Sequence, residues 1–173
     1  MSTETGTDLK TAVIVPMADL AVSQQPDDVL SSNPLGACLG IAIFDPNAHV
    51  GGILHSLLPA SSIDPLRAAT RPGMFLDTGF AALLDRAAKL GAKKENLQIF
   101  VAGGSQIMDE TAHFNIGKRN YEAFMDILTQ SKLQITAEDV GGYSNRTLLL
   151  SLATGEVRLR MSGQAKLKVL CKQ

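Results

Sequence analysis

Residues 35–59 read LGACLGIAIFDPNAHVGGILHSLLP, and this stretch decides the predicted fold. Its first half is almost continuously apolar, the turn-forming residues 45–47 interrupt it, and apolar residues resume at Val50. Short apolar runs bounded by such turns are typical of buried strands. The stretch therefore predicts two neighbouring strands, 35–44 and 50–58, joined by a tight connection.

Two side chains in this stretch have chemistry to offer. Cys38 lies among small residues, which leaves its sulfur accessible, and His55 lies in an otherwise apolar strand. Taken singly, each has an ordinary structural explanation, because free cysteine is often a buried hydrophobe and an isolated histidine is often a hydrogen-bonded core residue. Their presence on neighbouring strands favours thiol chemistry, although the sequence leaves the strand register open.

The rest of the chain predicts more strands than helices. Apolar residues at steps of three and four predict helices over residues 76–90 and 117–131, and residues 60–73, with two prolines, predict a long loop able to overhang a site. Further strands are predicted at residues 12–15, 97–102, 133–140, 147–152, 157–161 and 166–170. This pattern indicates an α/β or α+β layered domain.

Length and composition limit the class of protein. A chain of 173 residues predicts one domain, residues 11–173, after a polar and disordered tail at residues 1–10. A net charge of −1 gives no reason to expect nucleic acid. Cys38 and Cys171 form no disulfide framework, and no signal peptide or membrane-spanning stretch is evident. We therefore expect a cytoplasmic protein without direct membrane insertion.

Metal and nucleotide sites are not expected. His49 and His113 lack the paired short spacings of metal ligands, and no Gly-Lys-Ser/Thr follows the glycine pair at 103–104. The sequence therefore predicts neither a metal nor a cofactor.

Several short motifs, taken in chain order, resemble the CheD family of chemoreceptor glutamine deamidases. The motifs are Leu35-Gly36-Ala37-Cys38, Gly51-Gly52-Ile53-Leu54-His55 running to Pro59, Ala102-Gly103-Gly104, Asn115-Ile116-Gly117-Lys118-Arg119-Asn120, Gly141-Gly142 with Arg146, and Thr154-Gly155-Glu156-Val157. Each is modest alone, but their order is specific, and together they cover most of the chain.

The resemblance implies a site and a fold. Cys38 would be the nucleophile, His55 the base, and Ser32 the hydroxyl residue that orients the base. The family usually has threonine at the third position, so Ser32 keeps the hydroxyl but loses the methyl group that would restrict its rotamer. The implied fold class is α/β, with two packed mixed β-sheets flanked by helices in a layered α/β/β/α order, as a CheD-like cysteine hydrolase.

The resemblance also implies an activity and partners. The protein would be a protein-glutamine glutaminase of chemotaxis, a cysteine-dependent amidohydrolase that converts specific glutamines of methyl-accepting chemoreceptors to glutamate, and it could act on receptor methyl esters in the same way. Its partners would be the cytoplasmic helices of those receptors and a CheC-type phosphatase of the response regulator. The alternative is a regulatory module that binds the phosphatase with little or no catalysis.

Overall fold

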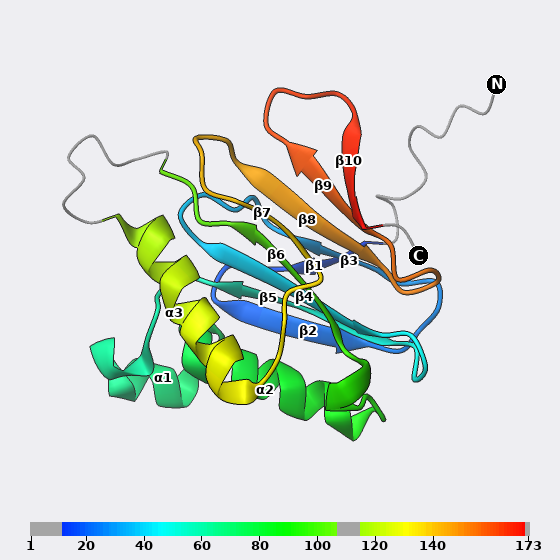
Figure 1. The fold of residues 1–173 in the computed structure, drawn as a ribbon, viewed down its shortest axis with the longest axis horizontal. Helices are drawn as coiled ribbons and strands as arrows, with labels where there is room; N and C mark the ends of the chain where they lie inside the picture. Colours follow the sequence, from blue (N-terminus) through cyan, green and yellow to red (C-terminus); the bar gives the residue numbers. More distant parts are fainter. Residues whose placement is uncertain (1–11, 107–114, 172–173) are drawn as a thin grey trace.

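Two five-stranded β-sheets pack face to face in the computed structural model, which describes residues 12–106 and 115–171 (Figure 1). The open sheet contains, in spatial order, β1 (Ala12–Val15), β3 (Val29–Ser32), β8 (Arg146–Ser151), β9 (Val157–Met161) and β10 (Leu167–Cys171). The helix-covered sheet contains β2 (Asp19–Ser23), β5 (Val50–Ser56), β4 (Leu39–Asp45), β6 (Gln98–Gly103) and β7 (Ala137–Val140). Each sheet is mixed, because β1 with β3 and β6 with β7 are parallel while the other pairs are antiparallel.

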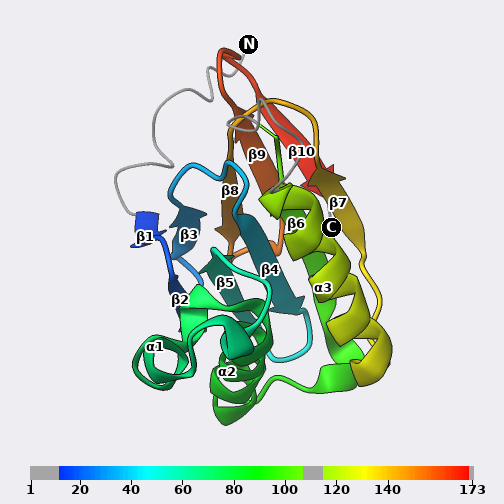
Figure 2. The ribbon, with the colours of Figure 1, turned by 90° about the vertical axis from the view of Figure 1, so that its left-hand side faces the viewer.

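The helices gather on one side of this pair of sheets (Figure 2). They are α1 (Pro65–Thr70), α2 (Leu76–Lys89) and α3 (Ile116–Ser131), with 3₁₀ turns at Ser61–Ile63, Pro72–Met74 and Lys94–Asn96. The rings of Phe80 and Phe124 meet edge to face at 5.0 Å and join α2 to α3. Within residues 12–106 and 115–171, no helix covers the outer face of the open sheet, and none is long and apolar enough to cross a membrane.

Strands β4 and β5 are buried on both faces and separate two apolar cores. Ile41 and Leu54 point toward the helices, whereas Ala42 and Ile53 point toward the open sheet. Successive side chains of a strand alternate between its faces. His55 is therefore in step with Ile53 and faces the layer between the sheets.

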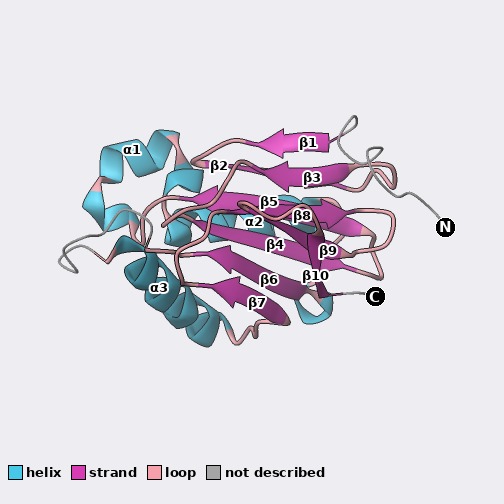
Figure 3. Cartoon of the chain, turned by 90° about the horizontal axis from the view of Figure 1, so that it is seen from above, coloured by secondary structure: helices cyan, strands magenta, loops and turns pink. Residues whose placement is uncertain are grey.

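The expected α/β class with two packed mixed sheets is confirmed, as are the strand pair around residues 45–47 and the two long helices. Figure 3 shows most strands of the two sheets lying along roughly the same axis. In the described residues the helices form a single outer layer, so the layers read α/β/β. The predicted tail at residues 1–10 and His113 lie outside the described residues.

Two parts of the sequence prediction were wrong. Residues 60–73 do not form a long loop, because Asp64 accepts a 3.0 Å hydrogen bond from the Arg67 amide and Pro65 occupies the first turn, so that helix α1 begins there. Strands β2 and β3 were also missed. Both are short, and β3 ends in two serines that break the apolar run.

Candidate active site

Cys38 is half-buried and lies directly before β4. It ends the segment 36–38, in which every backbone carbonyl accepts a hydrogen bond. The carbonyls of residues 36–38 accept hydrogen bonds from the Ser105 amide to Gly36 (3.0 Å), the Asn120 side chain to Ala37 (3.1 Å) and the Gly104 amide to Cys38 (2.9 Å). All three donors come from α3 or from the two residues that follow β6. The segment is thus anchored from one side.

The anchoring fixes where the amide groups of this segment point. Within a planar trans peptide, the N–H is opposite the carbonyl of the preceding residue. The N–H groups of Ala37 and Cys38 therefore point away from the donors that hold the Gly36 and Ala37 carbonyls. In the described part of the chain, neither N–H donates a hydrogen bond to another residue's backbone. The amides of Ala37 and of Cys38 itself are thus two adjacent donors that a substrate oxygen could use.

His55 reaches the same side of the sheet as Cys38. It pairs with Gly40 across β4 and β5, and Cys38 precedes Gly40 by two positions, so the parity of the strand places both side chains on one face. Cys38 packs against the inter-sheet core that this face covers. The sequence did not determine the register of β4 against β5. In the structure this register brings Cys38 and His55 to the same face of the sheet.

Both groups are electrically neutral at pH 7 before substrate binds. Burial lowers the pKa of His55 to about 4, and its side chain is fully buried. Burial also raises the pKa of the Cys38 thiol, and this outweighs the opposing effect of a hydrogen bond from its own backbone amide. The resting pair is a thiol and a neutral imidazole rather than an ion pair.

Ser32 approaches this layer from the opposite sheet. It is buried at the end of β3, in step with the core residue Leu30, and β3 packs against β5. Its hydroxyl oxygen accepts a 3.0 Å hydrogen bond from the Leu148 amide. Neither ring nitrogen of His55 has a hydrogen-bond partner among the described residues, so the hydrogen bond between Ser32 and His55 implied by the resemblance is not formed here. The second lone pair of the hydroxyl oxygen remains able to accept one.

Unpartnered buried polar atoms concentrate around this segment. Over the described residues they are both ring nitrogens of His55, the hydroxyl oxygen of Ser105 and the side-chain oxygen of Asn120. Ser105 and Asn120 each also hold a carbonyl of residues 36–38. Buried groups of this kind are rare in folded proteins and accumulate at functional sites. They identify the region around Cys38 as the best candidate site.

Sequence reasoning missed the position of Asn120. The residue entered only as part of a motif, yet it follows Gly117 and precedes Phe124 and Leu128 on the buried face of α3. An asparagine in an apolar helical stripe is unusual, and this signal could have selected it.

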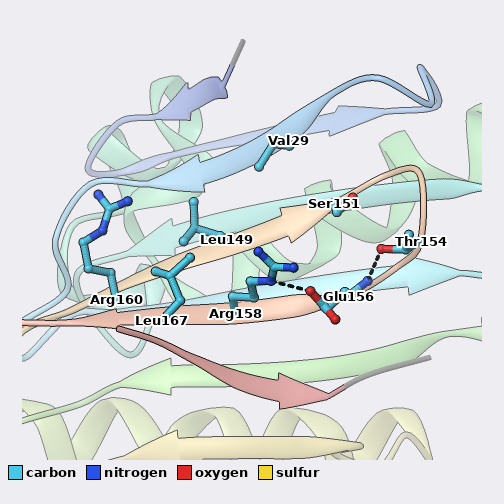
Figure 4. A pocket seen from close by; sticks show the side chains of 8 residues that line it. All are labelled: Val29, Leu149, Ser151, Thr154, Glu156, Arg158, Arg160 and Leu167. Atoms are coloured by element: carbon cyan, nitrogen blue, oxygen red, sulfur yellow. Dashed lines mark hydrogen bonds and ion pairs between the residues drawn. The ribbon is translucent and has the colours of Figure 1, made fainter. Parts of the chain in front are cut away.

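Two hollows in the surface lie outside the predicted triad. A pocket of about 220 Å³ lies on the outer face of the open sheet and is lined by Val29, Leu149, Ser151, Thr154, Glu156, Arg158, Arg160 and Leu167 (Figure 4). A second, of about 300 Å³, lies beside Gly104 and includes Tyr121 and Tyr143. In the portion of the chain that the structure describes, no three His, Cys, Asp or Glu side chains group as ligands for a metal ion.

A family profile described as CheD chemotactic sensory transduction matches residues 57–161, more than half of the chain. The chain belongs to the CheD family. It is 42% identical over 154 residues to a protein of Solibacter usitatus, covering 89% of this chain and 91% of the relative. It is also 42% identical over 151 residues to a protein of Syntrophus aciditrophicus, covering 87% and 94%. The first relative carries the name "Probable chemoreceptor glutamine deamidase CheD" and the second the name "Probable chemoreceptor glutamine deamidase CheD 1".

Membership in the CheD family confirms the resemblance read from the short motifs. The profile match begins at residue 57, after Ser32, Cys38 and His55. The roles of these three residues therefore depend on the geometry described above and on experiment.

Proposed function

We propose that this CheD-family protein is a protein-glutamine glutaminase that deamidates chemoreceptor glutamines, with Cys38 as nucleophile and His55 as base. The observation that carries the proposal is that Cys38 and the unpartnered His55 share one buried face, beside two amide groups that donate to no other residue's backbone among the described residues. The names of the relatives supply the substrate class.

The reaction begins with a proton transfer within the neutral pair. His55 takes the proton of the Cys38 thiol as the sulfur attacks the carboxamide carbon of a glutamine side chain, which forms the carbon–sulfur bond. Because the imidazole has a low pKa and the thiol a raised one, this transfer is unfavourable before substrate binds. The negative charge that forms on the substrate oxygen offsets it when the amide N–H groups of Ala37 and Cys38 donate to that oxygen.

The second half of the reaction returns the site to its starting state. The imidazolium of His55 donates its proton to the departing nitrogen, ammonia leaves, and a thioester remains on Cys38. His55 then takes a proton from water, whose oxygen attacks the thioester carbon. The carbon–sulfur bond then breaks, and His55 returns the proton to the departing sulfur, which leaves a glutamate side chain and the restored thiol. Ser32 would orient the ring in both halves by accepting a hydrogen bond from its second nitrogen.

Receptor recognition is assigned to the segment that follows His55. Residues 61–70 carry two strongly exposed apolar side chains, Ile63 at 56% and Leu66 at 86% of their full exposure. Exposed large apolar residues on a short helix suit contact with another protein better than contact with water. We expect this segment to contact the receptor helix around the target glutamine in the cytoplasm.

The proposal is tested with a purified receptor cytoplasmic fragment. Peptide mass spectrometry should show conversion of a few glutamines to glutamate by the wild-type protein, no conversion by Cys38→Ala, and no hydrolysis of free glutamine. A receptor fragment carrying glutamate methyl esters, assayed for methanol release, tests the esterase reaction. If no receptor side chain changes while a CheC-type phosphatase binds tightly, the regulatory-module alternative replaces the enzymatic function.

A further inference from the structure

Asn120 connects the two segments that carry the proposed catalytic pair. Its side-chain nitrogen donates to the Ala37 carbonyl at 3.1 Å and to the Leu57 carbonyl at 2.9 Å. Ala37 directly precedes Cys38, and Leu57 follows His55 by two positions. A single amide group of α3 thus bridges the loop before the nucleophile and the strand end after the base.

The bridge is buried and rigidly placed. Asn120 has no exposed surface, and its side-chain oxygen has no partner among the described residues. One helical turn earlier, a Cβ atom at Gly117 would lie 2.4 Å from the Gly104 carbonyl oxygen, so α3 touches the backbone beyond β6 directly. Residues three apart share a helix face, and this contact therefore sets the depth at which Asn120 reaches the loop.

We propose that Asn120 is a positioning residue, which keeps the Ala37–Cys38 peptide in the orientation that aims its N–H at the developing oxyanion and holds the Cys38 loop in register with His55. This inference rests on the proposed deamidase function. The two hydrogen bonds use both N–H donors of one side-chain amide. An aliphatic residue of similar volume leaves two buried carbonyls unpaired, and a carboxylate places a negative charge against both of them.

The test compares substitutions of Asn120 with a matched variant of the same helix. In the receptor-fragment assay, kcat and KM are measured per folded molecule, with the folded fraction taken from circular dichroism. Asn120→Leu should lower kcat by about a hundredfold with KM little changed, because a misplacement near 1 Å costs that much in rate. Leu128→Ala disturbs another buried position of α3 that makes no hydrogen bond to either segment, and its kcat should stay within about twofold of wild type.

Asn120→Asp separates a positioning role from a merely structural one, because only a positioning role makes its kcat relative to wild type depend on pH in the way described next. At pH 8 its carboxylate repels both carbonyls, whereas at pH 5.5 a protonated carboxyl can donate again to one of them. The kcat of Asn120→Asp relative to wild type should therefore rise as the pH falls, while that of Asn120→Leu relative to wild type stays flat.

Two results overturn the inference. One is a kcat of Asn120→Leu within about twofold of that of Leu128→Ala, and the other is an Asn120→Asp ratio that does not change with pH. Failure of the proposed function is recognised separately, because the wild-type protein would then convert no receptor glutamine, or Cys38→Ala would convert as many as wild type.

Discussion

Gly40 of β4 pairs with His55 of β5, so the position opposite the proposed base has no side chain. A Cβ atom at Gly40 would lie 2.5 Å from a terminal methyl group of Leu35. Leu35 is fully buried and stands three positions before Cys38. The absence of a side chain at Gly40 thus lets the start of the nucleophile segment pack directly over the strand.

Gly40→Ala should disturb the site more than the fold. The added methyl group displaces Leu35 and the loop after it, and we expect deamidation to fall about tenfold or more while the protein remains folded. Gly51→Ala, on the neighbouring strand β5 at the end of that strand far from His55, is the matched control, because its Cβ would meet Leu150 and Leu152 at 2.9 Å. It should lower the melting temperature without lowering kcat. Equal kcat losses in the two variants would contradict this account.

Cys38→Ala and His55→Ala should each abolish deamidation with the fold intact at neutral pH. Because nucleophile and base act as one unit, the double variant should be no slower than either single variant. Mass spectrometry of the receptor fragment measures all three. Additive losses, or glutamate production by Cys38→Ala or Cys38→Ser, would remove Cys38 from the proposed role.

The buried imidazole should make the protein acid-sensitive. Between pH 6.5 and about 4, the unfolded chain binds a proton at His55 that the folded chain does not, so the free energy of unfolding falls as the pH falls through this window. Above pH 6.5 the residue is neutral in both states and contributes no pH dependence.

This acid sensitivity can be measured by urea unfolding followed by circular dichroism. Going from pH 7.5 to pH 5, wild type should lose about 2 kcal/mol more than His55→Leu. His55→Leu should also be no less stable at pH 7.5, because it removes two unpartnered buried nitrogens. Identical pH dependence in both proteins would mean that the imidazole is solvated or protonated in the fold.

Ser32 has a structural partner as well as a proposed catalytic one. Ser32→Ala deprives the Leu148 amide of its acceptor and should destabilise the protein by about 1–3 kcal/mol. If Ser32 also orients His55, turnover per folded molecule should fall by a factor on the order of ten to a thousand. Ser32→Thr should keep both functions.

The neighbouring serine supplies the control for Ser32. Ser31 points to the other face of β3, and its hydroxyl donates to the Ser32 carbonyl at 3.3 Å. Ser31→Ala should leave turnover unchanged. If Ser32→Ala turns over as fast as Ser31→Ala, the orienting role belongs to another residue.

Leu66 should affect recognition and leave the chemistry unchanged. Leu66→Ser replaces an 86% exposed side chain and should not alter stability. We expect kcat/KM for the receptor fragment to fall several-fold, since an apolar contact with the partner is lost. Alkylation of Cys38 by iodoacetamide, measured in a Cys171→Ser background, should be unchanged. A variant that deamidates the receptor at the wild-type rate would place recognition elsewhere.

The parts of the fold that could be predicted were those with a strong local pattern. The apolar runs on either side of residues 45–47 became β4 and β5, and the three-and-four spacing predicted α2 and α3 within a residue or so. Helix α1 was missed because Pro65 was read as a loop residue, although proline is common in a first helical turn.

The candidate site could be predicted only in part from the sequence. Cys38 and His55 stood out because each is a reactive residue in an apolar run. The bridge made by Asn120 spans contacts between residues 83 and 63 positions apart, which depend on how α3 packs and not on any local pattern. The missing hydrogen bond between Ser32 and His55 likewise depends on side-chain orientation within the assembled core.

The proposed catalytic residues are divided between the two sheets. Ser32 ends a strand of one, whereas His55 lies in a strand of the other and Cys38 directly precedes a strand of that same sheet. Neither sheet alone contains all three. After dilution from denaturant, the rate at which deamidation recovers therefore reports the packing of the two sheets against each other. The rate at which the circular dichroism signal recovers reports the formation of the strands within each sheet. A delay between the two signals would measure the lifetime of a folding intermediate whose sheets are formed but not yet packed together.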